Sequence, residues 1–122
     1  MGMAIETRLS EQVARYIDLA ANEAKLTATN MANIDTPGYQ AVGMDFEGEM
    51  RDAMRRVDDG RAARTPRLVH PEGLVARPDG NNVSMDRESL NLAEEQLKFR
   101  TGVALLKGQY QEILDAIHVQ DK

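Results

Sequence analysis

The sequence of 122 residues contains no cysteine and no tryptophan, and only five of its residues are tyrosine or phenylalanine. Without cysteine the chain forms no disulfide, which suits a reducing compartment and equally suits a protein that passes unfolded through an export channel. Aromatic side chains supply much of the buried area of a compact core. Their scarcity favours long helices packed side by side over a self-contained globule.

Long apolar runs and a surplus of positive charge are missing as well. No run of 18 apolar residues is present, so we expect no direct membrane insertion. The first residues have neither the basic nor the apolar region of a signal peptide, so no cleaved secretory signal is expected. The 20 acidic residues outnumber the 15 basic ones and give a formal charge of -5, which argues against a nucleic-acid partner.

Residues that carry chemistry are few. His70 and His118 are the only histidines, and neither has a cysteine or an acidic residue at the spacing of a metal site. The neighbouring carboxylates of Glu94 and Glu95 point apart on a helix. No nucleophile motif or phosphate-binding motif is present. The sequence therefore predicts no catalytic, metal-binding or cofactor-binding residue, no cofactor and no enzymatic activity.

The N-terminal quarter of the chain has the pattern of a long helix. Between Ile5 and Ile34 there is no glycine or proline, and apolar or small residues recur in steps of four and three, which is the heptad pattern of a helix–helix seam. We predict an N-terminal helix within residues 1–34. Its small seam residues bury little area, so the helix needs a partner. The seam positions are Val13, Ile17, Ala20, Ala24, Thr27, Met31 and Ile34.

A second heptad pattern predicts a C-terminal helix within residues 85–122, with Asp86 as its N-cap. Gly102 and Gly108 lie inside this helix, where each costs about 1 kcal/mol relative to alanine, so a neighbouring backbone is expected to pack closely there. The seam positions are Leu92, Gln96, Phe99, Val103, Leu106, Tyr110, Ile113 and Ile117. A parallel stripe that widens the apolar face consists of Leu90, Ala93, Leu97, Ala104 and Leu105.

The middle of the chain, residues 35–84, holds all four prolines and is expected to be turn-rich and partly irregular. A short helix is predicted near residues 45–57, because Phe46, Met50, Met54 and Val57 recur on one helical face. The predicted fold is therefore mainly α. The two terminal helices pack as a coiled-coil-like hairpin, and the chain forms a single structural domain.

The junction between the first helix and the middle segment reads NMANIDTPGYQA. Asn30 and Asn33 fall in the last helical turn, where their amides either satisfy free backbone groups or bond to an adjacent chain. Pro37 and Gly38 fit the two central positions of a type II turn, with glycine supplying the positive φ. The motif therefore predicts a helix stop that sends the chain out sideways in a defined direction.

This junction is similar to the signature N-x-A-N-x-x-T-P-G-Y of the bacterial flagellar rod, hook and axial-protein family. The segment DGNNVSMDRE and the two heptad helices share the resemblance, which is weakest between Val57 and Ala76. The short length and the C-terminal pattern look most like the proximal-rod members of the family. The signature is matched at Asn30, Ala32, Asn33, Thr36, Pro37, Gly38 and Tyr39.

The resemblance implies a structural subunit of the flagellar basal-body rod, which crosses the periplasm after export by the flagellar type III apparatus. The implied partners are copies of the chain, other flagellar rod proteins, and the export gate with its adaptor ring. The signature residues would set the exit geometry. The alternative is a soluble helical adaptor or binding module of the export system, since heptads also permit an autonomous hairpin. The implied assembly residues are Val13, Ile17, Ala20, Ala24, Met31, Ile34, Leu92, Phe99, Val103, Leu106, Tyr110, Ile113 and Ile117.

A run of arginines in the middle segment has two interpretations that the sequence leaves open. One is a solvated, flexible loop, and the other is an electrostatic contact with acidic surfaces of adjacent subunits or of a surrounding membrane ring. The run consists of Arg51, Arg55, Arg56, Arg61, Arg64, Arg67 and Arg77.

Overall fold

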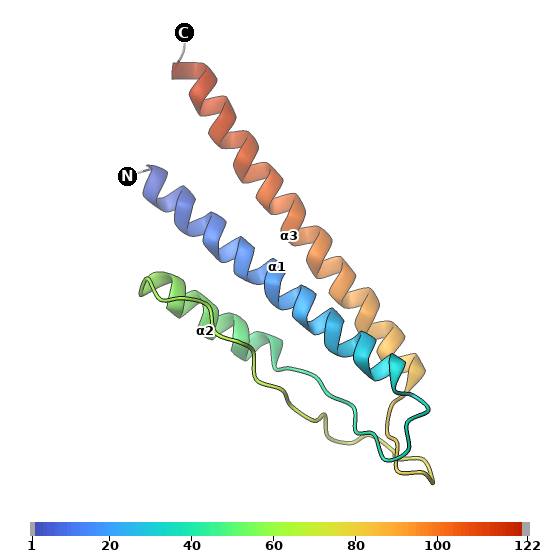
Figure 1. Cartoon of the computed structure of the whole chain (residues 1–122). Helices are drawn as coiled ribbons and strands as arrows, with labels where there is room; N and C mark the ends of the chain where they lie inside the picture. Colours follow the sequence, from blue (N-terminus) through green and yellow to red (C-terminus); the bar gives the residue numbers. More distant parts are fainter. Residues whose placement is uncertain (1, 121–122) are drawn as a thin grey trace.

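A computed structural model describes residues 2–120, with side chains from residue 7 to residue 119. It contains three helices, α1 (Gly2–Ala32), α2 (Phe46–Asp58) and α3 (Met85–Gln120), shown in Figure 1. The described residues form no named strand, only an isolated antiparallel bridge between Gly43 and Val69. The predicted mainly α fold with long terminal helices is confirmed. The predicted ranges 1–34 and 85–122 also include residues 1, 121 and 122, which lie outside the described residues.

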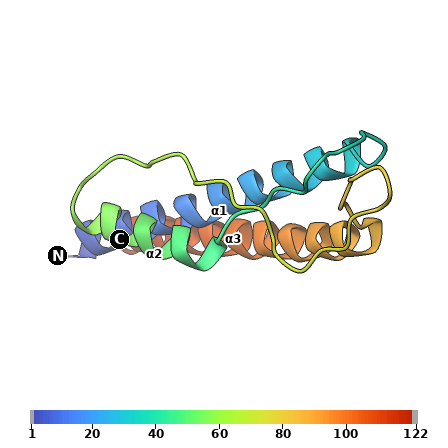
Figure 2. The ribbon, with the colours of Figure 1, turned by 90° about the horizontal axis from the view of Figure 1, so that it is seen from below.

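The helix α1 occupies the centre of the arrangement. α3 runs antiparallel along one side of α1, and α2 packs against the other side (Figure 1). The segment after α2 returns along the helices to the end where α1 stops and α3 starts, as Figure 2 shows from below. None of the described helices combines the length and the apolar composition needed to cross a bilayer.

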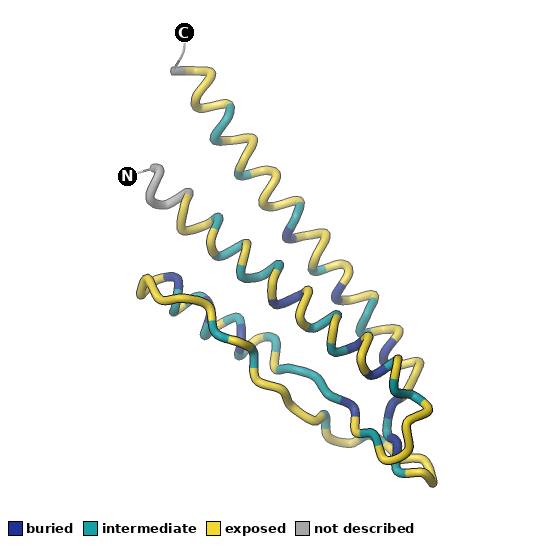
Figure 3. The backbone as a smooth tube through the Cα atoms, in the orientation of Figure 1, coloured by how far each residue is buried: buried dark blue, intermediate teal, exposed yellow. Residues whose placement is uncertain are grey.

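The core of this arrangement is thin and partly polar. Three of the buried apolar residues are alanines, and as many polar residues as apolar ones are buried. Much of α3 towards its C-terminal end is exposed (Figure 3). The buried apolar residues are Leu19, Ala20, Ala41, Ala53, Val57 and Val83. The buried polar residues are Thr27, Asn30, Glu49, Asn81, Glu88 and Glu95.

Polar pairs set the register of the antiparallel pair α1 and α3. The hydroxyl of Thr27 donates a hydrogen bond of 2.9 Å to Glu95 Oε2. About one turn earlier along α1, Glu23 pairs with Lys98 Nζ at 3.0 Å. Near the other end Ser10 Oγ donates to Gln109 Oε1 at 3.3 Å. These contacts follow one continuous seam, so the hairpin has a single register along its length.

The two glycines of α3 lie in different surroundings. A Cβ placed on Gly102 would lie 2.5 Å from Ile17 Cγ1 and 3.1 Å from Tyr16 Cδ2, so the close contact expected here exists, although side chains of α1 rather than its backbone make it. A Cβ on Gly108 would meet nothing within 4 Å. The expected close neighbour of Gly108 is therefore absent from the described part of the single chain.

The aromatic residue Phe46 joins all three helices. Its ring meets that of Tyr16 edge to face, with centroids 5.7 Å apart, and Lys98 Nζ lies 3.8 Å from its centroid. Edge-to-face pairs and cations over a ring face each stabilise by about 1 kcal/mol. This cluster anchors the start of α2 to the hairpin formed by α1 and α3.

The start of α3 differs from the prediction. The helix begins at Met85, and Ser84 caps it: Ser84 Oγ accepts from Arg87 N at 3.4 Å, and its carbonyl accepts from Glu88 N at 2.9 Å. The prediction of Asp86 as N-cap was therefore wrong by two residues. Asp86 lies inside the first turn, where its charge still favours the positive end of the helix dipole.

Candidate functional site: the exit turn and the exposed face of α3

The chain leaves α1 through the predicted type II turn. The amide of Tyr39 donates to the carbonyl of Thr36 at 3.2 Å, and Gly38 at the third position has a φ of 75°. A positive φ at this position is what a type II turn requires, and glycine adopts it without steric cost. Pro37 occupies the second position of the turn, where its ring fixes its own φ. The predicted turn geometry is confirmed.

Asn30 connects this turn to the end of the helix. Its side chain is buried, its Nδ2 donates to the carbonyl of Val42 at 2.8 Å, and its Oδ1 accepts from Val42 N and from the hydroxyl of Tyr39, both at 2.9 Å. Burial and then the charge of Glu88 raise the pKa of Tyr39, which keeps that hydroxyl protonated as a donor. Of the two roles considered for Asn30, the structure shows bonding within its own chain.

The other signature residues lie around the same turn. Asn33 Nδ2 donates to the carbonyl of Thr29 at 2.8 Å, while Asn33 Oδ1 accepts from the hydroxyl of Thr36 at 3.0 Å. Ala32 is the exposed last residue of α1, and Pro37 and Gly38 are also exposed at the tip of the turn. The signature therefore divides into residues that hydrogen-bond within the chain, of which Asn30 is buried, and an exposed tip.

The residue that holds this junction most completely is Asn81, which the sequence analysis did not single out. Its side chain is fully buried at 0 % exposure. Its Nδ2 lies within 3.0 Å of three carbonyls at the end of α1, and its Oδ1 accepts from Val83 N at 2.8 Å. The three carbonyls belong to Asn33, Ile34 and Thr36, which follow the last residue of α1. Asn81 connects them to a position 45 to 48 residues further along the chain, in addition to the donors that each already has.

A second turn, at residues 77–80, packs against the exit turn. Gly80 N donates to the carbonyl of Arg77 at 2.8 Å, and Gly38 N donates to the carbonyl of Asp79 at 2.8 Å. Gly80 has a φ of 86°, and a Cβ on it would lie 3.3 Å from the Cα of Gly38. Arg77 also donates to the carbonyls of Ile34 and Val83. The motif DGNN was the only sequence signal for this second turn.

The predicted assembly residues of the N-terminal helix are covered in part. Ala20 is buried and lies with Ala24 beside Glu95 of α3, and Ile17 packs against Gly102. Ile34 lies two residues beyond the end of α1. The half-buried members of the set are Val13, Ile17, Ala24, Met31 and Ile34. In a single chain Ile17, Ala20 and Ala24 therefore already contact α3.

The predicted assembly residues of α3 are less covered. The line of α3 that meets α1 is Glu88, Glu95 and Gly102, which are buried and spaced seven residues apart. The apolar positions lie beside this line or on the far face: Leu90 is 61 % exposed, Leu97 66 % and Tyr110 64 %. Phe99, Leu106 and Ile117 are also exposed, whereas Leu92, Val103 and Ile113 are half-buried.

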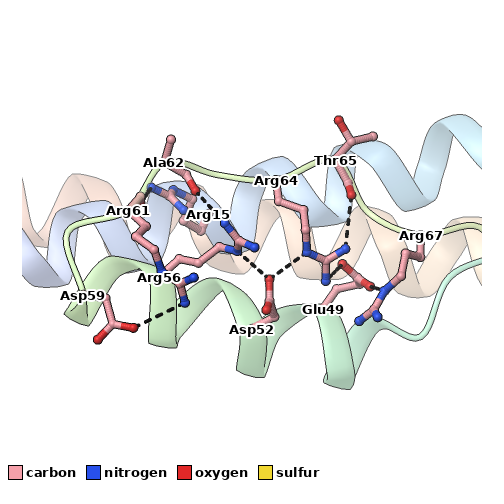
Figure 4. A network of polar contacts seen from close by, with 10 residues as sticks. All are labelled: Arg15, Glu49, Asp52, Arg56, Asp59, Arg61, Ala62, Arg64, Thr65 and Arg67. Carbon is pink, nitrogen blue, oxygen red and sulfur yellow. Dashed lines mark hydrogen bonds and ion pairs between the residues drawn. The ribbon is translucent and has the colours of Figure 1, made fainter.

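Several arginines of the middle segment are paired within the chain (Figure 4). Arg64 contacts Asp52 at 3.0 Å and Glu49 at 3.1 Å, Arg56 contacts Asp52 at 2.9 Å, and Arg67 contacts Glu49 at 3.4 Å. The hydrogen bond from Arg56, together with the contacts from Arg64, lowers the pKa of Asp52. These pairs lay the segment after α2 along that helix. Arg56, inside α2, and Arg64 are thus held within the chain rather than in a solvated, flexible loop, whereas the side chain of Arg67 stays 73 % exposed.

The fold and the exit turn define a class of protein. A long N-terminal helix that ends in the complete flagellar signature and packs against a long C-terminal helix is the arrangement of a bacterial flagellar axial protein. No protein-family model matches the chain.

Comparison with curated proteins gives the particular family. The chain is 33 % identical to the flagellar basal body rod protein FlgB of Salmonella typhimurium, over 83 % of this chain and 86 % of the relative. It is 30 % identical to FlgB of Yersinia enterocolitica, over 83 % and 87 %, and 30 % identical to FlgB of Cereibacter sphaeroides, over 85 % and 89 %. The chain belongs to the FlgB family of flagellar basal body rod proteins. Membership confirms the predicted family and assigns the chain to the rod of the basal body.

Proposed function

We propose that this chain is exported by the flagellar type III apparatus and polymerises through its terminal helices into the proximal part of the rod. The observation that carries the proposal is the exposure of apolar side chains on two sides of α3. Leu90 and Leu97, 61 % and 66 % exposed, lie on the side away from α1. Tyr110, 64 % exposed, lies beside the line that meets α1, as do the exposed Phe99 and Leu106. Large apolar side chains left uncovered along one helix favour a protein partner over solvent. The proposed neighbours are copies of this chain and other rod proteins, with the export gate and its adaptor ring at the base.

The exit turn has a defined task in this proposal. Every subunit of a helical polymer must direct its middle segment away from the packed helices in the same way. Asn30 and Asn81 fix that direction from inside the chain, through hydrogen bonds to the backbone of the turn. The surface left for neighbours then consists of the outer face of α3, the assembly residues beside it and the exposed tip of the turn.

A non-enzymatic role is part of the same proposal. The described residues hold no group of three or more His, Asp or Glu side chains placed to bind a metal ion. The buried carboxylates face a helix–helix seam, and the signature residues bond to backbone groups. The fold thus supports a role in assembly, carried by packing and by hydrogen bonds.

The test compares Leu106→Glu with Ser89→Glu, which adds the same charge at an exposed polar position of the same helix. Leu106 is 38 % exposed, so a carboxylate there can reach water in the free chain and should leave the monomer folded. We expect Leu106→Glu to abolish polymer formation in sedimentation assays and motility in a strain that lacks its own copy, while Ser89→Glu supports both. Normal motility of the Leu106→Glu strain would contradict the proposal. A sharply melting monomer that never polymerises would favour the adaptor alternative instead.

A further inference from the structure

A polar pocket opens between α1, α3 and the segments that form the bridge between Gly43 and Val69. Its volume is about 250 Å³. Residues from α1, α3 and both bridge segments line it, so its shape depends on the whole junction. It lies beside the helix seam and away from the apolar face of α3 on which the proposed polymerisation rests.

Two buried carboxylates in this pocket have unpaired oxygens. Glu88 is 2 % exposed and Glu95 is 4 % exposed. Glu95 Oε2 accepts from Thr27, but Glu95 Oε1 and Glu88 Oε2 are buried without a hydrogen-bond partner among the described residues. A buried acceptor without a donor is costly, and a buried carboxylate without a partner more so. The two oxygens therefore need hydrogen-bond donors, and the described chain does not supply them.

The ammonium group of Lys98 does not neutralise this pair. Lys98 is held by Glu23 at 3.0 Å and by the ring of Phe46. Its ammonium group therefore has partners on α1 and α2 already. The lining has four carboxylates, on Glu23, Glu88, Glu94 and Glu95, against two cationic groups, on Arg87 and Lys98, so it is negative by two charges when all are ionised.

The electrostatics of Glu95 agree with a pocket that lacks a cation. Burial raises the pKa of Glu95 to about 7, and the charges of Glu23 and Glu88 add to the increase, while the hydrogen bond from Thr27 and the charge of Lys98 oppose it. These groups come from both helices that face the carboxyl. A cation bound in the pocket would favour the ionised form and bring this pKa down.

The chemistry of the missing ligand follows from the acceptors. The described residues contain no set of three ligands for a metal ion. A guanidinium carries five N–H donors and an ammonium three, and both carry the positive charge that the pocket lacks. We propose that this pocket receives the end of an arginine or lysine side chain from a neighbouring rod subunit, with Glu88 and Glu95 as acceptors. The identity of the neighbour rests on the proposed function, whereas the chemistry of the pocket does not.

The pocket is tested first in the free chain, with propylguanidinium as the probe and propylurea as its uncharged analogue. Glutamate carboxyl carbons are labelled with carbon-13 in the full chain and followed by NMR. We expect propylguanidinium to shift the Glu88 and Glu95 signals saturably and to lower the pKa of Glu95, and propylurea to do neither. The variant Glu95→Gln should lower the affinity for propylguanidinium by about tenfold, since a charge-assisted hydrogen bond is lost.

The matched control for this titration is Glu11→Gln, which removes a carboxylate from an exposed position of α1 outside the pocket lining. It should leave the affinity for the probe within about twofold, as surface charges contribute little. Signals of Glu88 and Glu95 that move no more than those of exposed glutamates would overturn the proposal. Equal shifts with propylurea would overturn it too, because the pocket would not then distinguish charge.

The source of the side chain is tested in the assembled state. The double variant Glu88→Gln and Glu95→Gln should fold, as judged by circular dichroism, but form less polymer and support less motility than Glu11→Gln. If the double variant assembles normally while the parent chain binds the probe, the pocket is a site for free organic cations, and the proposed contact between subunits is overturned. If even the parent chain fails to polymerise, the proposed function fails, and the titration still decides the pocket.

Discussion

The buried carboxyl of Glu95 should make the stability of the α1–α3 hairpin depend on pH. Its pKa is about 7 in the folded chain, against 4.5 for an ordinary glutamate. The folded chain therefore holds a proton in this range that the unfolded chain has released. The free energy of unfolding should fall as pH rises from 4.5 to about 7, and stay low above that range. At roughly 1.4 kcal/mol per pH unit, the difference between the two pKa values corresponds to about 3 kcal/mol.

The variant Glu95→Gln removes this titration while keeping the shape of the side chain. Its amide oxygen can still accept from Thr27, but the amide nitrogen needs an acceptor, which costs about 1 kcal/mol. Near pH 8, where the parent chain bears the full penalty of a buried charge, the variant should be more stable by about 2 kcal/mol. Near pH 4.5 the order should reverse, with the variant less stable by about 1 kcal/mol.

The measurement is urea unfolding followed by circular dichroism at several pH values for both chains. Glu94→Gln is the control, because its side chain is exposed and adjacent in sequence. Taking the difference between parent and variant cancels the contributions of all other titrating groups. Unfolding free energies of the parent and Glu95→Gln that run parallel from pH 4.5 to about pH 8 would refute the reasoning, since the folded and unfolded chains would then bind the same number of protons at this site.

Three further predictions follow from the packing. Gly102→Ala should destabilise the folded chain by about 1 to 3 kcal/mol, because the new methyl group would overlap Ile17, whereas Gly108→Ala should stabilise it by about 1 kcal/mol; thermal melts compare the two. Asn81→Ala should cost about 2 to 3 kcal/mol, since the buried amide of Val83 loses its acceptor and three carbonyls after α1 lose a donor, and hydrogen exchange should show the end of α1 opening first. Asp52→Asn should remove part of the loss of stability at acid pH, because the lowered pKa of Asp52 gives a contribution that disappears as pH falls through its folded value; acid unfolding curves measure this.

Much of the fold could be predicted because the signals are local. A long stretch without glycine or proline, and apolar residues in steps of three and four, are enough to indicate α1 and α3. The clustering of prolines in residues 35–84 indicated where the long helices stop. The position of the cap at Ser84 was missed, because Ser84 and Asp86 are both good capping residues and the sequence alone does not choose between them.

The exit turn was predictable in part for the same reason. Pro37 and Gly38 determine their turn locally, so its type could be inferred from the two residues. Asn81 could not be assigned its role, because its partners are backbone carbonyls at the end of α1, and a carbonyl leaves no mark in the sequence. The two interpretations of the arginine run stayed open in the sequence for a related reason. The partners of these arginines, Glu49 and Asp52, become neighbours only when the chain folds back along α2.

The face of α3 that meets α1 could not be recognised from the sequence, because its residues are polar or small. Hydrophobic periodicity points to Phe99 and Leu106, but α1 packs on the line of Glu88, Glu95 and Gly102. This line gives little apolar burial and yet restricts the register. A shift of α3 by one residue would place Thr101 or Val103 where only Gly102 leaves room for Ile17.

The same shift would separate Thr27 from Glu95 and leave both buried groups unpaired. Buried polar groups are known to specify register at a cost in stability. A seam of this kind holds the hairpin in one alignment without consuming the apolar face of α3. That face stays exposed in the single chain, with Leu90 and Leu97 unburied. The division explains how a chain so poor in aromatic residues can have a defined fold and still keep an apolar surface for assembly.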